Sequence, residues 1–413
     1  MTAGSTWAGT HGFAASRLVD AGSIDEVRAV VAEGGPVRAL GTRHSFHDLA
    51  DTEGTLVTVT GIPADAVLDE ERREVTVGAG TRYGVLARWL EDRGWALHNL
   101  GSLPHISIGG AIATGTHGSG HGNGSLATAV RGLEYVDASG ALAEVRAGDP
   151  DFAALVVGLG AFGIVVRVTL AIEPSYRMRQ DVYSGLSWAA FLGDPDAVTG
   201  SAYSTSVFTT WGDEVGDVWR KARLDESVPP DEWLDARRRS DTASLVGSTE
   251  NLTEQLGVEG AWCDRLPHFR LDATPSNGDE IQSEYFVARS DAAAALSAVR
   301  ALGADIRPHL LVSELRTVRA DDLWLSGAYG RDTLAIHFTW ANHPGPVRAL
   351  LPRIEAALAP FAARPHWGKW HTMDAGAIAA VVPRLADARA VLERLDPDGR
   401  FANAHLRRLG VRV

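Results

Sequence analysis

Two glycine-rich stretches, about sixty residues apart, constrain the fold of this chain more than any other feature of its sequence. The first runs from Val37 to Phe46 and the second from Gly101 to Gly120. Small or hydroxylated residues dominate the second stretch, so its backbone can approach a ligand very closely. N–H groups and hydroxyls in such turns suit phosphate oxygens, which predicts a large ligand that carries phosphate. The alternative is that both stretches are tight turns that pack strand against strand.

Several separated motifs in these stretches resemble the flavin-binding half of the vanillyl-alcohol oxidase family. They are Gly41-Thr42-Arg43-His44-Ser45-Phe46, Gly101-Ser102-Leu103-Pro104-His105-Ile106-Ser107 and Ala113-Thr114-Gly115-Thr116-His117-Gly118. Within the family the chain is most similar to the alditol oxidases, with the aldonolactone oxidoreductases as relatives, and the similarity covers nearly the whole chain. The resemblance implies FAD with its pyrophosphate on the glycine loops and a covalent bond from His44 to the isoalloxazine ring.

The resemblance also implies a set of cofactor-binding residues. These are Gly41, Thr42, Arg43, His44, Ser45, Phe46, Gly101, Ser102, Ser107, Gly110, Ala113, Thr114, Gly118, Ile164 and His366. Members of the superfamily that attach FAD twice use a cysteine near the second loop. The single cysteine here, Cys263, lies elsewhere in the sequence, so one bond through His44 is expected.

Composition narrows the class of protein. A chain of 413 residues is long enough for two or three domains, each with its own core. The net charge of −13 argues against a nucleic-acid or anionic-membrane partner. One cysteine excludes an intrachain disulfide and fits a reducing compartment. Residues 1–18 lack the pattern of a signal peptide, and the apolar run 152–166 is too short to span a membrane. We therefore expect a cytoplasmic monomer.

The first 175 residues alternate helical and strand patterns, which favours an α+β domain. Ser23-Ile24-Asp25-Glu26 has the form of a capping box, and apolar residues follow it at helical spacing. Thr81 is expected to cap a helix over 83–93. A turn at 138–140 between two strand-like runs predicts a hairpin, and 164–172 is rich in β-branched residues, as a strand would be.

Gly158-Leu159-Gly160-Ala161-Phe162-Gly163 matches the dinucleotide-binding pattern G-x-G-x-x-G. That pattern has meaning only between a strand and a following helix. Here a helical run precedes it and a β-branched run follows, so a tight helix-to-strand turn is the better interpretation.

From about residue 175 to 280 the periodicity is weak, and strands with long loops are expected. Farther on, 284–287 is predicted as a strand, and 292–302, 347–358 and 385–395 as helices. Two strands stand out, at 310–318 and 334–340. Alternation places Val312, Glu314 and Arg316 on one face of the first and Ala335, His337 and Thr339 on one face of the second, opposite an apolar face of Leu334, Ile336, Phe338 and Trp340.

On spacing alone, Glu314 and Arg316 are most simply an exposed ion-pair face. His337 and Thr339 on a similar strand, and Lys369 between two tryptophans, favour a site instead. In alditol oxidases a Glu-x-Arg strand, a His-x-Thr strand and a His-x-x-Lys turn line the polyol pocket. The matching residues here are Glu314, Arg316, His337, Thr339, His366 and Lys369. The aldonolactone relatives share much of this set, so it supports the reaction type better than the substrate.

His117 and His121 are four residues apart, as in helical metal sites. The intervening Gly118-Ser119-Gly120 does not favour a helix, so no metal is expected.

Taken together, the sequence predicts a two-domain α+β flavoprotein of the vanillyl-alcohol oxidase type. Residues 1–175 and 372–413 would hold FAD, and 176–371 would form a substrate-binding cap on an antiparallel sheet. The expected reaction oxidises the terminal CH–OH of a polyol to an aldehyde and reduces O₂ to H₂O₂. Arg316 and Lys369 would stabilise alkoxide charge, while Glu314, His337, Thr339 and Ser102 would bind the other hydroxyls. The alternatives are an aldonolactone oxidase or dehydrogenase and a non-catalytic flavin- or sugar-binding protein.

Overall fold

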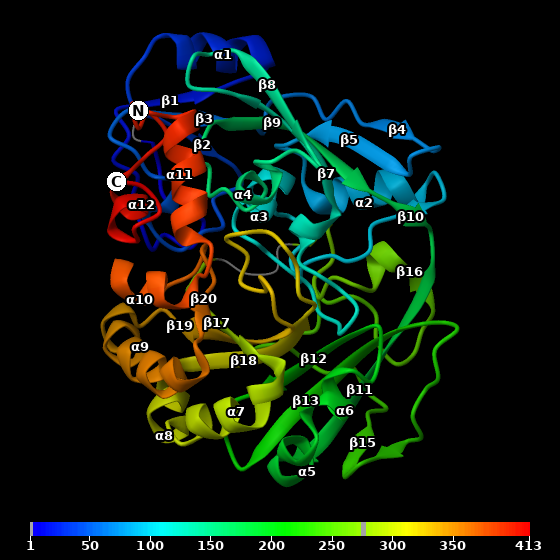
Figure 1. The fold of residues 1–413 in the computed structure, drawn as a ribbon. Coiled ribbons are helices and arrows are strands. Elements are labelled where there is room, and N and C mark those ends of the chain that lie inside the picture. The colour runs from blue at the N-terminus through cyan, green and yellow to red at the C-terminus, as the bar shows by residue number, and fades with distance from the viewer. Residues whose placement is uncertain (1–2, 274–277) are drawn as a thin grey trace.

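The computed structural model describes residues 3–273 and 278–413, which form an upper and a lower half in Figure 1. The upper half contains the N-terminal part of the chain, coloured from blue through cyan to green. The C-terminal helices α11 (Leu385–Leu395) and α12 (Ala404–Arg408), in red, return to this half and lie beside its strands (Figure 1). The lower half contains the middle of the chain, coloured green to orange.

Two sheets organise the described residues of the upper half. The first is parallel, in the order β1 (Arg17–Asp20), β3 (Thr55–Thr58), β2 (Val37–Leu40). The second is antiparallel, in the order β4 (Val67–Asp69), β5 (Glu74–Gly78), β9 (Ile164–Ala171), β7 (Val130–Val136), β8 (Leu142–Arg146). The helices here are α1 (Ile24–Ala32), α2 (Tyr83–Glu91), α3 (Ile108–Ala113) and α4 (Phe152–Leu155), and β6 (Trp95–Ala96) pairs with β10 (Glu173–Pro174).

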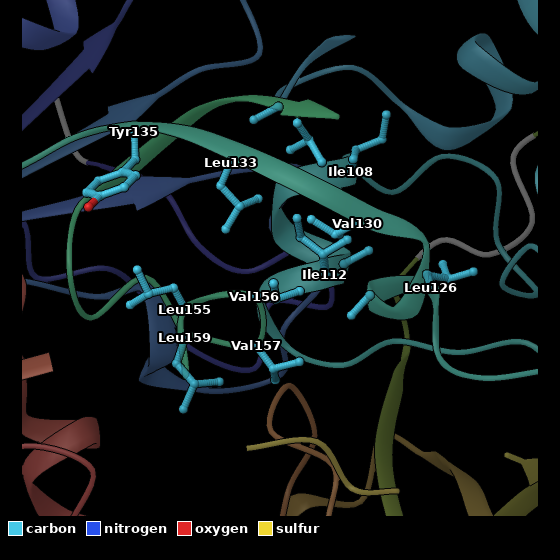
Figure 2. Packing of buried hydrophobic residues seen from close by; sticks show 14 of the residues in the cluster. Ile108, Ile112, Leu126, Val130, Leu133, Tyr135, Leu155, Val156, Val157 and Leu159 are labelled. Carbon is cyan, nitrogen blue, oxygen red and sulfur yellow. The ribbon is translucent and has the colours of Figure 1, made fainter. Parts of the chain in front are cut away.

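Helix α3 is the element through which the second glycine stretch joins the core. Ile108 and Ile112, four residues apart, lie on one face of the helix and pack with Val130 and Leu133 of β7 (Figure 2). An added Cβ at Gly109 would lie 3.0 Å from Cβ of Ala79, so this glycine permits close packing. The apolar face thus anchors the helix and leaves its small residues on the other side.

The lower half is built on one antiparallel sheet, the cap sheet. Among the described residues its order is β14 (Glu232–Trp233), β15 (Ala236–Arg238), β11 (Arg177–Ser187), β13 (Glu214–Arg223), β12 (Ser204–Thr209), β18 (Leu310–Val318), β19 (Thr333–Ala341), β17 (Glu280–Ala288), β20 (Arg364–Pro365), with β16 (Gly260–Ala261) paired to β11. The other helices are α5 (Trp188–Gly193), α6 (Pro195–Thr199), α7 (Ala292–Arg300), α8 (Gly303–Ile306), α9 (Pro344–Leu358) and α10 (Ala375–Val381).

Helices α7 and α9 pack against the cap sheet, on its lower side in Figure 1. The predicted apolar face of β19 is confirmed, because Leu334, Ile336, Phe338 and Trp340 are fully buried in the cluster that these helices complete. The opposite face of β19 is therefore turned toward the upper half.

The α+β fold class is confirmed. The domain boundaries at 175 and 371 stay a prediction, although every strand of the cap sheet falls between them.

Several local predictions can be compared with the structure. Ser23 Oγ accepts the N–H of Glu26 at 3.2 Å, as a capping box requires, but the Glu26 carboxylate accepts from Gly22 instead of Ser23. The predicted cap at Thr81 is wrong. Helix α2 has Arg82 as its N-cap, with no side-chain cap hydrogen bond, and the Thr81 hydroxyl is buried without a partner among the described residues.

The glycine pattern at 158–163 is a turn between α4 and β9, as interpreted from the sequence. Leu159 and Gly160 have positive φ angles of 55° and 64°, which turn the chain sharply from helix to strand. The hairpin of β7 and β8 is also confirmed. The weakly periodic stretch up to about residue 280 contains the short helices α5 and α6, which were not predicted, and its residues 274–277 lie outside the described part. No helix among the described residues is long and apolar enough to cross a membrane.

Candidate active site

A cavity of about 540 Å³ lies between the two halves of the molecule. Its upper wall consists of residues 41–47, 101–103 and 109–114, and its lower wall of side chains from β17, β18 and β19. The polar faces predicted for β18 and β19 therefore meet the glycine-rich stretches across one enclosed space.

The two glycine-rich stretches are tied together at this cavity. Ser107 N–H donates to Thr42 Oγ1 at 3.0 Å, and Thr42 N–H donates to Ser107 Oγ at 3.4 Å. A Cβ added at Gly41 would lie 2.4 Å from Ser107 Oγ, so only glycine allows the loops to come this close. The result is a cradle of small residues with a long cavity along it, which fits a dinucleotide such as FAD.

His44 lies on the wall of the cavity, with its ring stacked on Trp7 at a centroid distance of 5.2 Å. Its Nδ1 atom is buried and has no hydrogen-bond partner among the described residues. Burial lowers the pKa of His44 to about 4, with smaller contributions from His105 and Arg82, so the imidazole is neutral near pH 7. A neutral ring with a free nitrogen fits covalent attachment to a cofactor.

Most of the predicted cofactor residues line the cavity: Gly41, Thr42, Arg43, His44, Ser45, Phe46, Gly101, Ser102, Ser107, Gly110, Ala113, Thr114 and His366. Gly118 and Ile164 lie outside this lining. A Cβ at Gly118 would lie 2.4 Å from the carbonyl oxygen of Leu100, so this glycine serves backbone packing. Ile164 begins β9 and is fully buried in the core of the upper half.

Three neighbouring strands of the cap sheet bring the substrate-side residues together. His337 on β19 is paired in register with Glu314 on β18 and with Glu284 on β17. The alternation predicted for Val312, Glu314 and Arg316 is confirmed, because all three line the cavity. Glu314 and Arg316 are each only 6% exposed, so the exposed ion-pair face is the wrong interpretation.

Glu284 is the centre of this wall, and sequence analysis did not identify it as functional. Its Oε1 accepts hydrogen bonds from His117 Nε2 and Arg316 Nη2, both at 3.0 Å, and its Oε2 accepts from Lys369 Nζ at 2.5 Å. Burial would raise the pKa of Glu284, but Lys369, His117 and Arg316 together hold it well below its usual range. A carboxylate directly before the largely apolar run 285–288 was the available signal.

Arg316 connects this wall to the second glycine-rich stretch. Its Nη1 donates to Ser102 Oγ at 3.2 Å and to the carbonyl of His117 at 3.3 Å. Burial opposes the charge, but Glu314 and Glu284 raise the pKa of Arg316 above its usual value. Its Nε has no hydrogen-bond partner among the described residues, and the carboxylate of Glu314 is 3.6 Å away. The guanidinium is therefore charged. Three of its five N–H groups are used in these hydrogen bonds, which leaves the Nε–H and one Nη2–H.

Lys369 is held by two groups. Besides Glu284, it contacts Nδ1 of His337 at 2.8 Å, and His337 Nε2 contacts Thr339 Oγ1 at 2.9 Å. Burial, and then Lys369, lower the pKa of His337 to about 4, so the ring is neutral and its Nδ1 accepts from the ammonium. An ammonium has three N–H groups, so one is left for the cavity.

The turn that carries Lys369 is anchored by its tryptophans. Trp367 Nε1 donates to the carbonyl of Leu325 at 2.6 Å, and Trp370 Nε1 donates to the carbonyl of Phe46 at 2.6 Å. The two indoles therefore fix the turn to its surroundings. His366, in the same turn, lines the cavity, and its Nδ1 accepts the N–H of Gly368 at 3.0 Å.

His117 and His121 do not converge. His117 binds Glu284, whereas His121 Nε2 contacts Thr199 Oγ1 at 2.9 Å. Among the described residues, His47, Asp48 and His405 have a spacing that could hold a metal ion. Arg408 Nη2 already contacts both carboxylate oxygens of Asp48, at 2.8 and 3.0 Å. The guanidinium of Arg408 is therefore the cation that pairs with this carboxylate.

Comparisons with known proteins agree with this geometry. The FAD binding domain family matches residues 15–146, and the D-arabinono-1,4-lactone oxidase family matches residues 275–409. The alditol oxidase of a Streptomyces species is 41% identical over 416 residues, which cover 99% of each chain. The L-gulono-1,4-lactone dehydrogenase of Mycobacterium tuberculosis is 30% identical over 431 residues, which cover 98% of each chain.

A solved structure described as a solvent-stable cholesterol oxidase is similar in fold, with a TM-score of 0.81 at 17% identity. The match covers 98% of this chain and 97% of that one. At this identity the likeness concerns the fold alone, whereas the alditol oxidase is similar in sequence from end to end. The chain therefore belongs to the vanillyl-alcohol oxidase family of flavoproteins and, within it, to the alditol oxidases.

Proposed function

We propose that this protein is an FAD-dependent oxidase that converts the terminal CH–OH of alditols, such as xylitol and sorbitol, to the aldehyde and reduces O₂ to H₂O₂. The observation that carries the proposal is the pair of cations, Arg316 and Lys369, each with an N–H left for a ligand in one buried cavity. The glycine cradle forms the opposite wall. The sequence similarity to an alditol oxidase supports the same reaction.

The cradle would hold the cofactor, with His44 as the residue that forms the covalent bond. FAD, when bound, supplies the acceptor for the hydride that leaves the substrate carbon. The chain's own task is to stabilise the negative charge that the substrate oxygen carries once its proton has left and until the departing hydride turns the C–O bond into a carbonyl. Arg316 and Lys369 are fixed beforehand by Glu284, so they do this without reorganisation.

The remaining hydroxyls of a polyol need both donors and acceptors. Glu314, Thr339 and Ser102 line the same cavity and supply them. Burial would raise the pKa of Glu314, but Arg316 and His268 hold it well below its usual range, so its carboxylate is an acceptor near pH 7. A pocket that hydrogen-bonds several hydroxyls discriminates strongly against analogues that lack them.

An aldonolactone is the second candidate substrate. The match of residues 275–409 to the D-arabinono-1,4-lactone oxidase family favours it, because those residues carry most of the cap side of the site. A lactone ring presents hydroxyls of the same kind to the same groups.

The test is a panel of tetritols, pentitols and hexitols beside L-gulono-1,4-lactone, with H₂O₂ release as the readout. We expect turnover of the polyols to exceed that of the lactone. Arg316→Ala serves as the control for activity at this site. Anaerobic mixing with the preferred polyol should bleach the flavin absorbance. A flavin that stays oxidised with every compound would instead identify a non-catalytic binding protein.

A further inference from the structure

The sequence contains two lysines, Lys221 and Lys369, against 37 arginines. Lys369 belongs to the cavity wall already described. Lys221 lies on β13, is only 1% exposed and has no part in the proposed reaction. A buried ammonium is costly unless hydrogen bonds and a counter-charge compensate for its lost hydration.

Every N–H of Lys221 has a partner. Its Nζ lies 2.6 Å from the carbonyl oxygen of Leu266, 2.9 Å from that of Pro267 and 3.0 Å from Nδ1 of His268. Two carbonyls and an imidazole arranged around one point suit a compact ammonium better than a planar guanidinium. Burial lowers the pKa of Lys221 well below its usual value, and the negative charge of Glu314 opposes this lowering. In its ammonium form Lys221 can only donate, so the third contact requires a lone pair on His268 Nδ1.

This requirement sets the tautomer of His268. With Nδ1 as acceptor, the ring proton is on Nε2, which lies 2.7 Å from Oε1 of Glu314. His268 therefore donates to the carboxylate. The ring cannot turn easily, because it packs edge-on against Trp219 and Phe208 at centroid distances of 5.3 and 5.5 Å.

The segment that carries His268 also contacts the second glycine-rich stretch. The backbone N–H groups of His268 and Phe269 both donate to the carbonyl of Ser102, at 3.0 and 3.2 Å. Ser102 Oγ in turn accepts from Arg316. His268 thus connects Ser102, from the upper half, with Glu314, from the cap sheet.

We propose that Lys221 and His268 are positioning residues. They keep Glu314 in place as an ionised acceptor for a substrate hydroxyl, and they keep Ser102 at a fixed position relative to Glu314. Oε1 of Glu314 is taken by His268, whereas Oε2 lies 3.6 Å from Nε of Arg316, beyond hydrogen-bond distance, and can accept from a substrate hydroxyl. This inference rests on the proposed function, since it assigns Glu314 a polyol hydroxyl. The alternative is that Lys221 only cross-links the 266–268 segment to β13.

Removal of the cation separates the two possibilities. In Lys221→Met the imidazole loses the donor that fixes its Nδ1, and the positive charge near Glu314 is lost. The Nε2–H of His268 is then less firmly placed, so the Glu314 carboxylate is held less firmly. We expect the apparent affinity for the polyol, measured by anaerobic flavin reduction at about pH 8, to fall about tenfold or more, as for a buried hydrogen bond to a charged group. Flavin content and reoxidation by O₂ should be unchanged.

The pH dependence is the specific signature. Burial, and then Lys221, hold the pKa of His268 at about 4, while Glu314 opposes both and Arg316 adds to the lowering. Without Lys221 this pKa rises, so His268 takes up a proton as the solution becomes acidic. The imidazolium then restores the lost positive charge beside Glu314 and makes the Nε2–H a stronger, charged donor to its carboxylate. Polyol affinity of Lys221→Met should therefore recover as the pH falls from about 8 to about 5.5, whereas a purely structural lesion should not.

Arg220→Met is the matched control. Arg220 is the neighbouring residue on β13, is also 1% exposed and faces the other way, where its guanidinium binds Ser201. This variant should lose stability but keep the wild-type affinity at every pH.

A pair of substitutions at His268 decides the question even if Lys221→Met does not fold. In His268→Gln the amide can accept from Lys221 and donate to Glu314, so polyol affinity should stay near wild type. In His268→Leu it should fall as in Lys221→Met.

Two outcomes overturn the inference and leave the oxidase function standing. One is equal polyol affinity in His268→Gln and His268→Leu, and the other is a Lys221→Met variant that behaves like Arg220→Met at all pH values. A wild-type flavin that no polyol reduces overturns the proposed function itself, and the inference with it.

Discussion

Nζ of Lys369 lies 2.8 Å from Nδ1 of His337, and the ammonium is the donor in this contact because the imidazole is neutral. His337 therefore positions the ammonium of Lys369. Its Nδ1 lone pair is already used in this contact, so Nδ1 does not accept the proton of the substrate. The ammonium is fixed between a carboxylate and an imidazole lone pair before any substrate arrives.

This arrangement predicts that Arg316 and Lys369 act in the transition state. Arg316→Ala and Lys369→Ala should each lower the rate of anaerobic flavin reduction by roughly two or more decades, about 3 kcal/mol, as for loss of one preorganised donor. Stopped-flow absorbance of the flavin measures this rate. Glu314→Gln should cost less than either, because an amide oxygen can still accept one hydrogen bond.

Arg364→Ala is the control for these variants. Arg364 is also a buried arginine of the cap, and it donates to the carbonyls of Val381, Gly327 and Tyr329. It should affect stability and leave the reduction rate near wild type. If the Arg316 and Lys369 variants instead weaken only the apparent polyol affinity, both residues bind the substrate and the transition state equally well.

Glu284→Gln should make the reaction sensitive to alkaline pH. Burial lowers the pKa of Lys369, and the negative charge of Glu284 opposes this lowering. Without Glu284 the pKa of Lys369 falls further, so the ammonium is lost at a lower pH. The reduction rate of the variant should decline between about pH 6 and about pH 9, while the wild-type rate changes less.

Asp181→Asn provides the comparison for Glu284→Gln. Asp181 is a buried carboxylate of β11 whose partner is Arg179, at 2.8 and 2.9 Å. The Asp181→Asn variant should lose stability, but the pH profile of its reduction rate should match that of the wild type. The same profile in Glu284→Gln and wild type would show that Glu284 does not maintain the charge of Lys369.

His44 is predicted to bond FAD covalently. Its buried, neutral ring lies on the cavity wall, and its Nδ1 has no hydrogen-bond partner within residues 3–273 and 278–413. Acid precipitation should leave the flavin with the protein pellet, whereas the flavin of His44→Ala should be released into the supernatant. His105→Ala, which also changes a histidine beside the cavity loops, should keep the flavin in the pellet. A colourless wild-type pellet would contradict the bond.

Gly101 is predicted to admit O₂ to the reduced flavin, because the family resemblance places this position against the ring. The structure does not require glycine for the turn. A Cβ here would meet Thr116, His117 and Ile106 at 3.7 to 3.8 Å, which is ordinary contact. Gly101→Val or Gly101→Pro should slow reoxidation by O₂ and leave anaerobic reduction by polyol largely intact.

The two half-reactions, followed separately at the flavin absorbance, distinguish the possible roles of Gly101. Equal slowing of both would indicate a structural role for the glycine. Unchanged reoxidation in a folded Gly101→Val variant would remove this position from the control of oxygen access.

The sequence predicted those parts of the site that a local pattern determines. Glu314, Arg316, His337 and Thr339 follow the two-residue period of single strands, so their shared orientation could be inferred from residues next to each other in the chain. Glu284 could not be found in this way. Its role depends on the pairing of β17 with β19, and no local pattern specifies which strands become neighbours.

His268 was beyond sequence reasoning for a related reason. It lies in an irregular segment between β16 and β17 with no periodicity, and its function follows from contacts with β13 and β18. The wrong N-cap at Thr81 has a simpler cause. The helix starts one residue after Arg82 because the backbone there pairs with Ser107, a contact from the second glycine stretch.

The placement of the two lysines has a practical consequence for spectroscopy. In most proteins, isotope labelling of lysine gives many overlapping signals from the solvated surface. Here both ammonium groups are buried, one on the cavity wall and one beneath Glu314. A sample grown with labelled lysine would therefore give two side-chain resonances, and each would report the protonation and hydrogen bonding of one layer of the site without any substitution in the chain.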